Sequence, residues 1–270
     1  MRGHVTDPNR DGTVPTELQA ALEHLAGTET LLVALDFDGV LAPIVPRAED
    51  ARPLPASAAA VAALADLPRT STAFISGRAL ASLRAVASPD ERTLLIGSHG
   101  GEVFTGPDSP PLVLDESQRH ALAAATAVVE KVVAAHPGTR LEAKPAGVVL
   151  HTRTAADDVA AAATERARAA LQDIPGLHLS DGKRVLETSV LSADKGQGID
   201  LLRTFSGATA VFFAGDDVTD EHAFAVLRPA DVGVKVGPGN TAAQYRVDSP
   251  QSFTAALALL AELRSAAAQA

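Results

Sequence analysis

The stretch LLVALDFDGVL, residues 31–41, decides how this chain is expected to fold. It begins with an uncharged apolar run, which is typical of a parallel strand buried on both faces of a sheet. Asp36 follows the run directly, and Asp38 comes two positions later. Two carboxylates at this spacing can converge on a metal ion and a phosphate once the chain turns, but they repel each other unless a cation neutralises them. The stretch therefore predicts a cation-dependent site at a strand end, and an acidic Asx-turn or capped loop is the plainer alternative.

Strands and helices alternate on both sides of this stretch. Further strands are expected where apolar runs recur, at 70–75, 93–96, 210–214 and 232–236. This alternation predicts an α/β fold with a doubly wound parallel sheet, in which ligands bind beyond the carboxyl ends of the strands. Asp36, Ser76 and His99 all lie at or just beyond the ends of predicted strands.

The segment 107–190 interrupts this alternation. Its expected order is a long helix, two strands that can pair as a hairpin, a second helix and two more strands. This pattern predicts a smaller α+β domain inserted into the first one. The expected organisation is a disordered N-terminal lead over 1–15, a core over 16–106 and 191–270, and the inserted domain over 107–190.

Composition and charge exclude several kinds of partner. The chain has 270 residues, of which 46% are hydrophobic, so it can bury a sizeable core. Its formal net charge is −10, which argues against nucleic acid or an anionic membrane as a partner. No uncharged apolar run approaches the ~18–20 residues of a membrane span, and the N-terminus has no apolar signal-peptide segment. The cytoplasm is therefore the expected location, and the oligomeric state stays open, with a monomer among the options.

A second acidic segment follows the strand predicted at 210–214. Residues 215–221, Gly-Asp-Asp-Val-Thr-Asp-Glu, carry Asp216, Asp217 and Asp220 at the expected start of a helix. Acidic residues at such a place can simply cap the helix and complement its dipole. Beside the first motif, they also supply oxygen ligands from a separate strand, as a Mg²⁺ site needs.

Two single polar residues add to these motifs. Ser76 follows the strand predicted at 70–75, and Lys195 begins a helix after the inserted segment. A serine before glycine is usually part of a turn, and a lysine before glycine is usually solvated, so neither is informative alone. Together with the acidic motifs, they supply a nucleophile, an acid, a phosphate anchor and metal ligands.

These motifs, in this order, resemble those of the haloacid dehalogenase superfamily, and 31–263 is similar more narrowly to the trehalose-6-phosphate phosphatases. Many members of that family have threonine where this chain has Val40, but the superfamily accepts either residue. The resemblance implies a Rossmann-like core with 107–190 as its inserted cap. It rests on the motifs at 36–43, 76–78, 99–102, 141–144, 151–153, 182–187, 195–196, 215–221 and 234–237.

The resemblance also implies the catalytic roles. Asp36 would attack phosphorus and form an aspartyl phosphate. Asp38 would protonate the leaving sugar oxygen and then deprotonate the water that hydrolyses the intermediate. Ser76 and Lys195 would hold the non-bridging phosphate oxygens, and the charge of Lys195 would offset the carboxylates.

A Mg²⁺ ion is the implied cofactor. The carboxylates of Asp36 and Asp216 and the backbone carbonyl of Asp38 would hold it. Asp217 and Asp220 would assist the metal indirectly or through water, and the sequence does not decide between these two residues. The ion would overcome the repulsion between an anionic nucleophile and an anionic phosphate.

The predicted cap carries the residues expected to recognise the sugar. Polar side chains on strands often just face solvent, but a sugar offers many hydroxyl groups to carboxylates and bases that share one sheet face. The candidates, all placed on predicted cap strands, are Glu142, Lys144, His151, Arg153 and Glu187. Arg78 and His99 are expected to approach the same substrate from the core.

The implied activity is Mg²⁺-dependent hydrolysis of trehalose 6-phosphate, a small-molecule sugar phosphate. Another sugar-phosphate phosphatase or a phosphomutase of the same superfamily is the nearest alternative. A non-catalytic sugar-phosphate-binding protein on the same fold is a further one. The presence of Asp36, Asp38 and Lys195 together argues against it.

Overall fold

Strand β1 (Leu31–Leu35) is buried along its whole length and lies at the centre of a seven-stranded sheet. The computed structural model describes residues 13–182 and 184–269, so most of the predicted disordered lead lies outside the described residues. Strands β2 (Thr70–Ile75) and β9 (Ala210–Gly215) flank β1 and run parallel to it. The strands that follow β1 in the sequence are added first on the β2 side of it and later on the β9 side. The topological switch of the sheet therefore lies at β1.

The described residues divide into two compact units, one of 13–110 with 194–269 and the other of 111–182 with 184–193. The predicted domain limits, 106/107 and 190/191, fall within a few residues of this division. In the first unit the remaining strands are β3 (Leu94–Gly97), β4 (Glu102–Phe104), β10 (Val232–Val236) and β11 (Tyr245–Val247). Its helices are α1 (Thr16–Ala26), α2 (Pro55–Ala65), α3 (Leu80–Ala87), α6 (Lys195–Ser206), α7 (Glu221–Ala225) and α8 (Pro250–Gln269).

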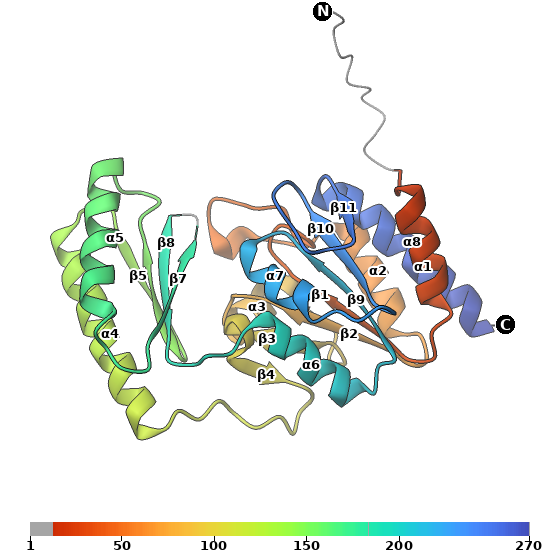
Figure 1. Cartoon of the computed structure of the whole chain (residues 1–270), viewed down its shortest axis with the longest axis horizontal. Helices are drawn as coiled ribbons and strands as arrows, with labels where there is room; N and C mark the ends of the chain where they lie inside the picture. The colour runs from red at the N-terminus through yellow and green to blue at the C-terminus, as the bar shows by residue number, and fades with distance from the viewer. Residues whose placement is uncertain (1–12, 183, 270) are drawn as a thin grey trace, which may run out of the picture. The chain divides into compact units, whose positions relative to one another are not determined.

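The large sheet has the order β11-β10-β9-β1-β2-β3-β4, and only β4 pairs in the antiparallel direction. Apolar side chains alternate between its two faces, so each face buries its own cluster. One cluster joins the sheet to α1, α2, α3 and α8, and the other joins it to α6 and α7. This layering is the predicted doubly wound α/β fold, which is confirmed, although β4 and β11 were not among the predicted strands (Figure 1).

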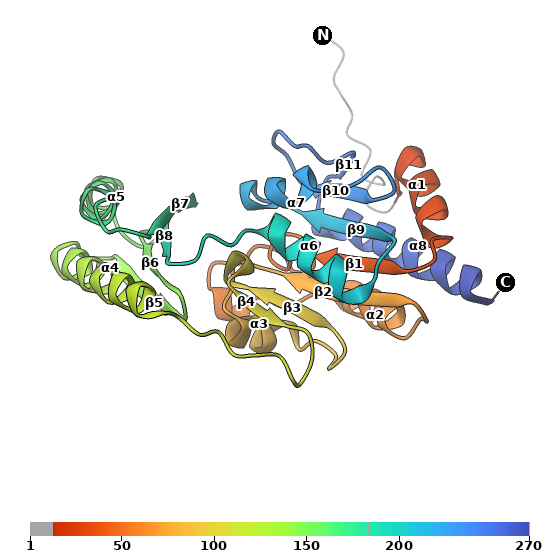
Figure 2. The same ribbon diagram turned by 60° about the horizontal axis from the view of Figure 1, so that its bottom comes forward.

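The second unit is an antiparallel sheet covered by two helices. Its order is β5-β6-β8-β7, and the β5–β6 pair forms the predicted hairpin. Figure 2 shows helices α4 and α5 together on one side of this sheet, where their alanines and valines pack against Val148, Leu150 and Leu186. The elements are α4 (Glu116–Ala135), β5 (Arg140–Lys144), β6 (Gly147–His151), α5 (Asp157–Leu171), β7 (His178–Gly182) and β8 (Val185–Ser189).

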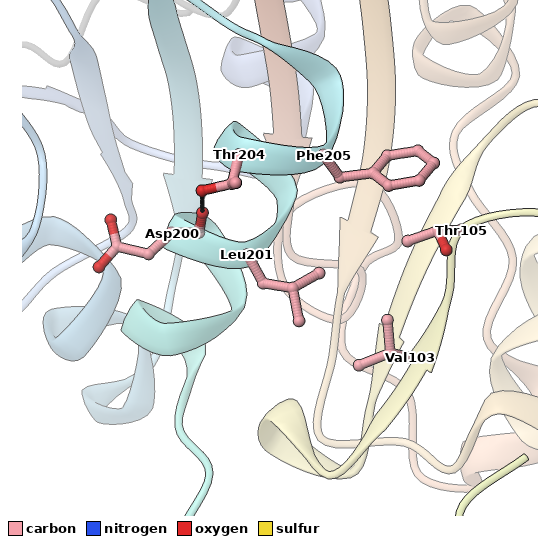
Figure 3. Close-up of a pocket in the computed structure, with 6 residues that line it drawn as sticks. All are labelled: Val103, Thr105, Asp200, Leu201, Thr204 and Phe205. Atoms are coloured by element: carbon pink, nitrogen blue, oxygen red, sulfur yellow. Dashed lines mark hydrogen bonds between the residues drawn. The ribbon is translucent and has the colours of Figure 1, made fainter. Parts of the chain in front are cut away.

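A shallow hollow lies between α6 and the edge strand β4 within the first unit. Its volume is about 590 Å³, and its lining is mostly apolar. Figure 3 shows Leu201 and Phe205 of α6 facing Val103 and Thr105 across it. The side chains of Leu201 and Phe205 are both exposed. None of the helices formed by the described residues combines the length and apolar character that crossing a membrane requires.

Arg264 on α8 ties three chain segments together. Its guanidinium donates to the carbonyl oxygens of Ala26 at 2.9 Å and Arg69 at 3.0 Å, and to the Thr70 hydroxyl at 3.1 Å. It also donates to the carbonyl oxygen of Thr28. These acceptors lie at the end of α1, in the loop after it and at the start of β2. One side chain therefore holds these segments together beside the N-terminal end of β2.

We predict that Arg264→Ala lowers the free energy of unfolding by about 2–3 kcal/mol, because several largely buried carbonyl groups lose their donor. Urea denaturation followed by circular dichroism measures this as a lower midpoint at an unchanged slope. Arg47→Ala is the control, since it removes an exposed ion pair with Asp50 and should leave the midpoint unchanged. Equal midpoints for Arg264→Ala and the wild type would contradict the structural role of this residue.

Candidate active site

Asp36 occupies the first position beyond β1. Its backbone N–H donates to the carbonyl oxygen of Ala214 on β9 at 3.0 Å, which continues the parallel ladder one step past the strand. Its Oδ1 accepts from the N–H of Phe37 at 2.7 Å, and the residue is buried. The side chain of Asp36 is therefore fixed at the carboxyl edge of the sheet by the backbone of two central strands.

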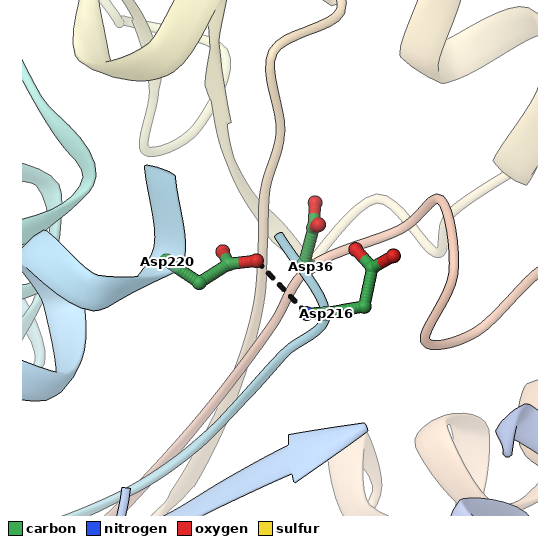
Figure 4. Close-up of side chains that lie close together, drawn as sticks. All are labelled: Asp36, Asp216 and Asp220. Carbon is green, nitrogen blue, oxygen red and sulfur yellow. Dashed lines mark hydrogen bonds between the residues drawn. The ribbon is translucent and has the colours of Figure 1, made fainter. Parts of the chain in front are cut away.

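Three carboxylates converge at this edge. Ligand atoms of Asp36, Asp216 and Asp220 all lie within 4.8 Å of one another, and Figure 4 shows the three side chains grouped at the ends of β1 and β9. The loop after Asp36 approaches this group closely, and Gly39 has a positive φ of 80°. A Cβ atom at Gly39 would lie 2.1 Å from Asp216 Oδ2, so only glycine fits beside that carboxylate.

Lys195 is buried among these acidic residues. Its Nζ donates to Asp220 Oδ1 at 2.6 Å and lies 3.1 Å from Asp36 Oδ1. The side chain is 2% exposed, so the ammonium has almost no contact with water and depends on these carboxylates. One cation thus bridges the acid at the end of β1 and the acid at the start of the helical segment after β9.

Burial and mutual repulsion perturb the ionisation of the group. Burial, followed by the charges of Asp220, Asp216 and Asp38, holds the pKa of Asp36 well above its usual range, although Lys195 opposes this. Burial and the charges of Asp220 and Asp217 raise the pKa of Asp216 to about 6. Burial acts to lower the pKa of Lys195, but the charges of Asp220 and Asp36 outweigh it and raise that pKa. A further cation beside these carboxylates would therefore favour their ionised forms.

The donor set fits a hard divalent cation. Asp220 is committed to the protein, since its Oδ2 accepts the N–H groups of Asp216 and Asp217 at 2.9 Å each. Among the described residues, none donates a hydrogen bond to the carboxylate of Asp216. Asp36 and Asp216 thus offer carboxylate oxygens, the ligand type that Mg²⁺ prefers. Asp217, also a predicted metal residue, is outside the cluster, and its Oδ1 accepts from the N–H of Val218 at 2.8 Å.

Asp38 forms a bidentate ion pair that the sequence did not indicate. Arg78 Nε lies 2.6 Å from Asp38 Oδ2, and Arg78 Nη2 lies 2.7 Å from Asp38 Oδ1. The guanidinium also lies over the ring of Phe37, at 5.6 Å from its centroid. Arg78 was expected to contact the sugar, but in the structure it holds the predicted acid and base residue.

Ser76 lies at the end of β2, as predicted, and it is buried. Its N–H donates to the carbonyl oxygen of Ile96 at 2.9 Å, and its Oγ accepts from the N–H of Arg78 at 3.2 Å. Ser76 thus lies at the same sheet edge as Asp36, one strand away. His99 belongs to the short helical turn Ser98–Gly100, and its side chain lies outside the described part of the chain.

The second unit presents four of its predicted sugar-binding residues on one sheet face. The strand register aligns Glu142 with Val149 and Val149 with Glu187, and Lys144 and His151 share that face by alternation. Glu142 Oε2 lies 2.7 Å from His151 Nε2, and this bond and the nearby cations lower the pKa of Glu142. Lys144 and Glu187 form an ion pair.

Arg153, the fifth predicted residue of this unit, is not on a strand. It lies in an exposed turn beyond the end of β6. The strand placement predicted for it was therefore wrong, because the extended segment ends at His151. The opposite face of the sheet is apolar and packs on the helices, so the polar face takes no part in the hydrophobic core of this unit.

Lys235 belongs to the site, although sequence reasoning gave it no role. It is buried on β10, and its Nζ donates to the carbonyl oxygen of Asp216 at 2.6 Å. The signal in the sequence was a single charged residue inside the apolar strand Val232–Val236. A lysine in such a strand needs a partner, and the acidic loop provides one.

Several curated proteins are similar to this chain. A trehalose-6-phosphate phosphatase of Escherichia coli is 35% identical over 218 residues, which covers 78% of this chain and 79% of that protein. A trehalose-phosphate phosphatase of Mycobacterium avium is 34% identical over 265 residues, covering 91% of this chain and 66% of that protein. An uncharacterized glycosyl hydrolase of Mycobacterium tuberculosis is 33% identical, and the chain spans 20% of its length. This chain thus corresponds to only part of several relatives.

Solved structures share the fold. The C-terminal domain of a trehalose-6-phosphate phosphatase of Candida albicans superposes with a TM-score of 0.77. The match covers 93% of this chain and 99% of that domain at 21% identity, which supports the fold alone. The family model for trehalose-phosphatase matches residues 34–254, a range that holds both acidic motifs, Ser76 and Lys195. The chain belongs to the trehalose-phosphatase family.

Proposed function

We propose that this protein hydrolyses trehalose 6-phosphate to trehalose and inorganic phosphate, with Mg²⁺ as cofactor and Asp36 as the nucleophile. The observation that carries the proposal is the convergence of Asp36, Asp216 and Asp220 around Lys195 in a member of the trehalose-phosphatase family. Relatives named as trehalose-phosphate phosphatases support the choice of substrate.

In the first step, a carboxylate oxygen of Asp36 attacks phosphorus, and the bond from phosphorus to the sugar oxygen breaks. Asp38 gives a proton to that oxygen, which leaves as the trehalose hydroxyl. In the second step, Asp38 takes a proton from a water molecule as it attacks phosphorus, and the aspartyl phosphate releases phosphate and the free Asp36 carboxylate. One aspartate thus serves as acid and then as base.

The other residues of the site stabilise charge. Lys195 lies against Asp36, so its ammonium can compensate charge on the phosphate oxygens that gather there. Ser76 offers a hydroxyl from the neighbouring strand end. Asp36 and Asp216, with the carbonyl of Asp38, would hold Mg²⁺, which supplies charge neutralisation between the anionic nucleophile and the anionic phosphate.

The polar sheet face of the second unit is proposed to recognise the sugar. Glu142 and Glu187 are held by His151 and Lys144, so their carboxylates are already oriented before a ligand binds. Oriented carboxylates accept hydrogen bonds from sugar hydroxyls and discriminate against ligands that lack them. Roles for Arg78, His99 and Arg153 at the sugar stay predictions, as do a cytoplasmic location and a monomeric state.

Another sugar-phosphate phosphatase or a phosphomutase uses the same chemistry at phosphorus, so the phosphate site alone does not identify the sugar. A panel of sugar phosphates assayed for phosphate release separates these functions. The proposal expects the highest kcat/KM on trehalose 6-phosphate. A mutase would need a bisphosphate activator and would release little phosphate.

Removal of the metal should abolish activity. We expect no turnover in excess EDTA, full recovery on addition of Mg²⁺, and inhibition by Ca²⁺, because Ca²⁺ takes more ligands at longer distances and would misplace Asp36. Phosphate release measured across a series of metal concentrations checks this. Activity that persists in excess EDTA would rule out the proposed cofactor.

Asp36→Asn should reduce turnover by at least about 10³-fold, because an amide cannot form the acyl phosphate. The fold should persist, since the amide is similar in size and removes one of several repelling charges. Phosphate release and a thermal melt together test this. If the variant kept more than a few per cent of activity, another residue would have to be the nucleophile.

Substitutions on the polar sheet face of the second unit should separate sugar recognition from phosphate chemistry. Glu187→Ala or Glu142→Ala should lose about 10- to 150-fold in kcat/KM on trehalose 6-phosphate, since a hydrogen bond to a charged group contributes roughly 1.5–3 kcal/mol. Hydrolysis of p-nitrophenyl phosphate should change far less. Lys195→Ala should impair both substrates, because both present the same phosphate.

The matched control is Asp181→Ala. It removes a carboxylate of the same sheet that forms an exposed ion pair with Arg168 and does not share the polar face. Both substrates should be hydrolysed at wild-type rates by this variant. Equal losses on both substrates for Glu187→Ala and Glu142→Ala would mean that these residues support folding, and the sugar would have to be recognised elsewhere.

A further inference from the structure

Lys235 is a buried cation that the proposed reaction does not use. It lies on β10, where it pairs in register with Gly215 at the end of β9. Only 4% of its side chain is exposed. A lysine is rarely buried unless its ammonium is paired, so its surroundings indicate what it does.

The ammonium of Lys235 holds the backbone of the acidic loop. Its Nζ donates to the carbonyl oxygens of Asp216 at 2.6 Å and Asp217 at 3.4 Å. Glu221 Oε1, which is buried and has no hydrogen-bond partner among the described residues, lies 3.9 Å from the same nitrogen. Lys235 therefore binds two successive carbonyl groups and places a positive charge near the buried Oε1 of Glu221.

Asp220 holds the same two residues by their other polar groups, because its Oδ2 accepts both N–H groups. The loop at Asp216 and Asp217 is thus fixed by a carboxylate through its amides and by an ammonium through its carbonyls. The carboxylate of Asp216 stays available, while the backbone that carries it is held on both sides.

Close packing leaves little room for the loop at Asp216 and Asp217 to move. A Cβ atom at Gly39 would meet Asp216 Oδ2 at 2.1 Å, and one at Gly215 would meet Asp220 Cγ at 2.3 Å. Both contacts show backbone packed closely against the acidic side chains. A shift of the loop would therefore either collide with the Asp36 loop or carry Asp216 away from Asp36.

We propose that Lys235 is a positioning residue for the metal site: by binding the carbonyls of Asp216 and Asp217, it sets the carboxylate of Asp216 beside Asp36. This inference rests on the proposed metal site and adds to it a residue that touches neither the ion nor the substrate. Residues that orient metal ligands in this way typically affect metal affinity by about 10- to 100-fold.

The direction in which metal affinity changes when Lys235 is replaced distinguishes a positioning role from a purely electrostatic one. Removing a cation near a cation site would strengthen metal binding if charge were its only contribution. Weaker binding after removal of the ammonium therefore reports the loss of position. The test needs only a metal-binding measurement and does not depend on turnover.

The probe is Mn²⁺, which also prefers oxygen ligands and whose free form is measured directly by electron paramagnetic resonance. Lys235→Met should raise the Kd for Mn²⁺ by about 10- to 100-fold, and the Kd for Mg²⁺ derived from competition should rise by a similar factor. Lys235→Arg, which keeps a donor and the charge, should recover part of the affinity. A thermal melt verifies that each variant is folded.

Arg246→Met is the matched control, because Arg246 also donates to two backbone carbonyls, those of Gly237 and Gly239, but does not touch the acidic loop. Its Kd should equal that of the wild type. If Lys235→Met does not fold, Lys235→Gln replaces it, since the amide ends one bond short of the carbonyls and the same loss is expected.

Unchanged or tighter Mn²⁺ binding in a folded Lys235→Met or Lys235→Gln protein would overturn the positioning role. An equal loss in Arg246→Met would also overturn it, because the effect would then be general. Failure of the wild type itself to bind Mn²⁺ would instead contradict the proposed metal site. The two failures are therefore distinguishable.

Discussion

Repulsion among three carboxylates is the constraint on which this structure depends. Asp36, Asp216 and Asp220 meet where β1 and β9 end, and a single buried ammonium from Lys195 lies among them. Backbone amides, the ammonium groups of Lys195 and Lys235 and close packing hold this group, and the mutual repulsion of the carboxylates favours a further cation. In the proposed function, this site attracts a divalent cation and, through it, a phosphate. The binding chemistry thus follows from an electrostatic imbalance that the fold maintains.

The central strands supply the positions, and the side chains supply the charge. The ladder between β1 and β9 continues through Asp36, so the predicted nucleophile has a fixed place in the sheet. The polar face of the second unit is built differently. Its ion-paired carboxylates lie on β5 and β8, which flank β6, and the opposite face of the sheet is apolar and packs on helices. The proposed function uses this difference, since phosphate needs concentrated charge and a sugar needs several oriented hydrogen-bonding groups.

The sequence was sufficient to predict the central strands of the large sheet, because five-residue apolar runs and their spacing are local properties, but it did not reveal the short edge strands β4 and β11. The resemblance to the trehalose-6-phosphate phosphatases implied that Asp36 and Asp216 would meet, and the structure groups their carboxylates. The sequence did not predict which charges pair. Arg78 was assigned to the sugar and instead binds Asp38, and Lys235 was given no role. Such pairs join residues far apart in the chain through the conformation of loops, which a single sequence does not reveal.

The most direct test of the account is to identify the residue that carries phosphate during turnover. Wild-type protein mixed with Mg²⁺ and trehalose 6-phosphate is quenched in acid within the first turnover, and its peptides are examined by mass spectrometry. The proposed mechanism predicts one phosphoryl group on the peptide that contains Asp36, and none in the Asp36→Asn protein. Phosphate release with no phosphorylated peptide, or phosphate on any other residue, would contradict it.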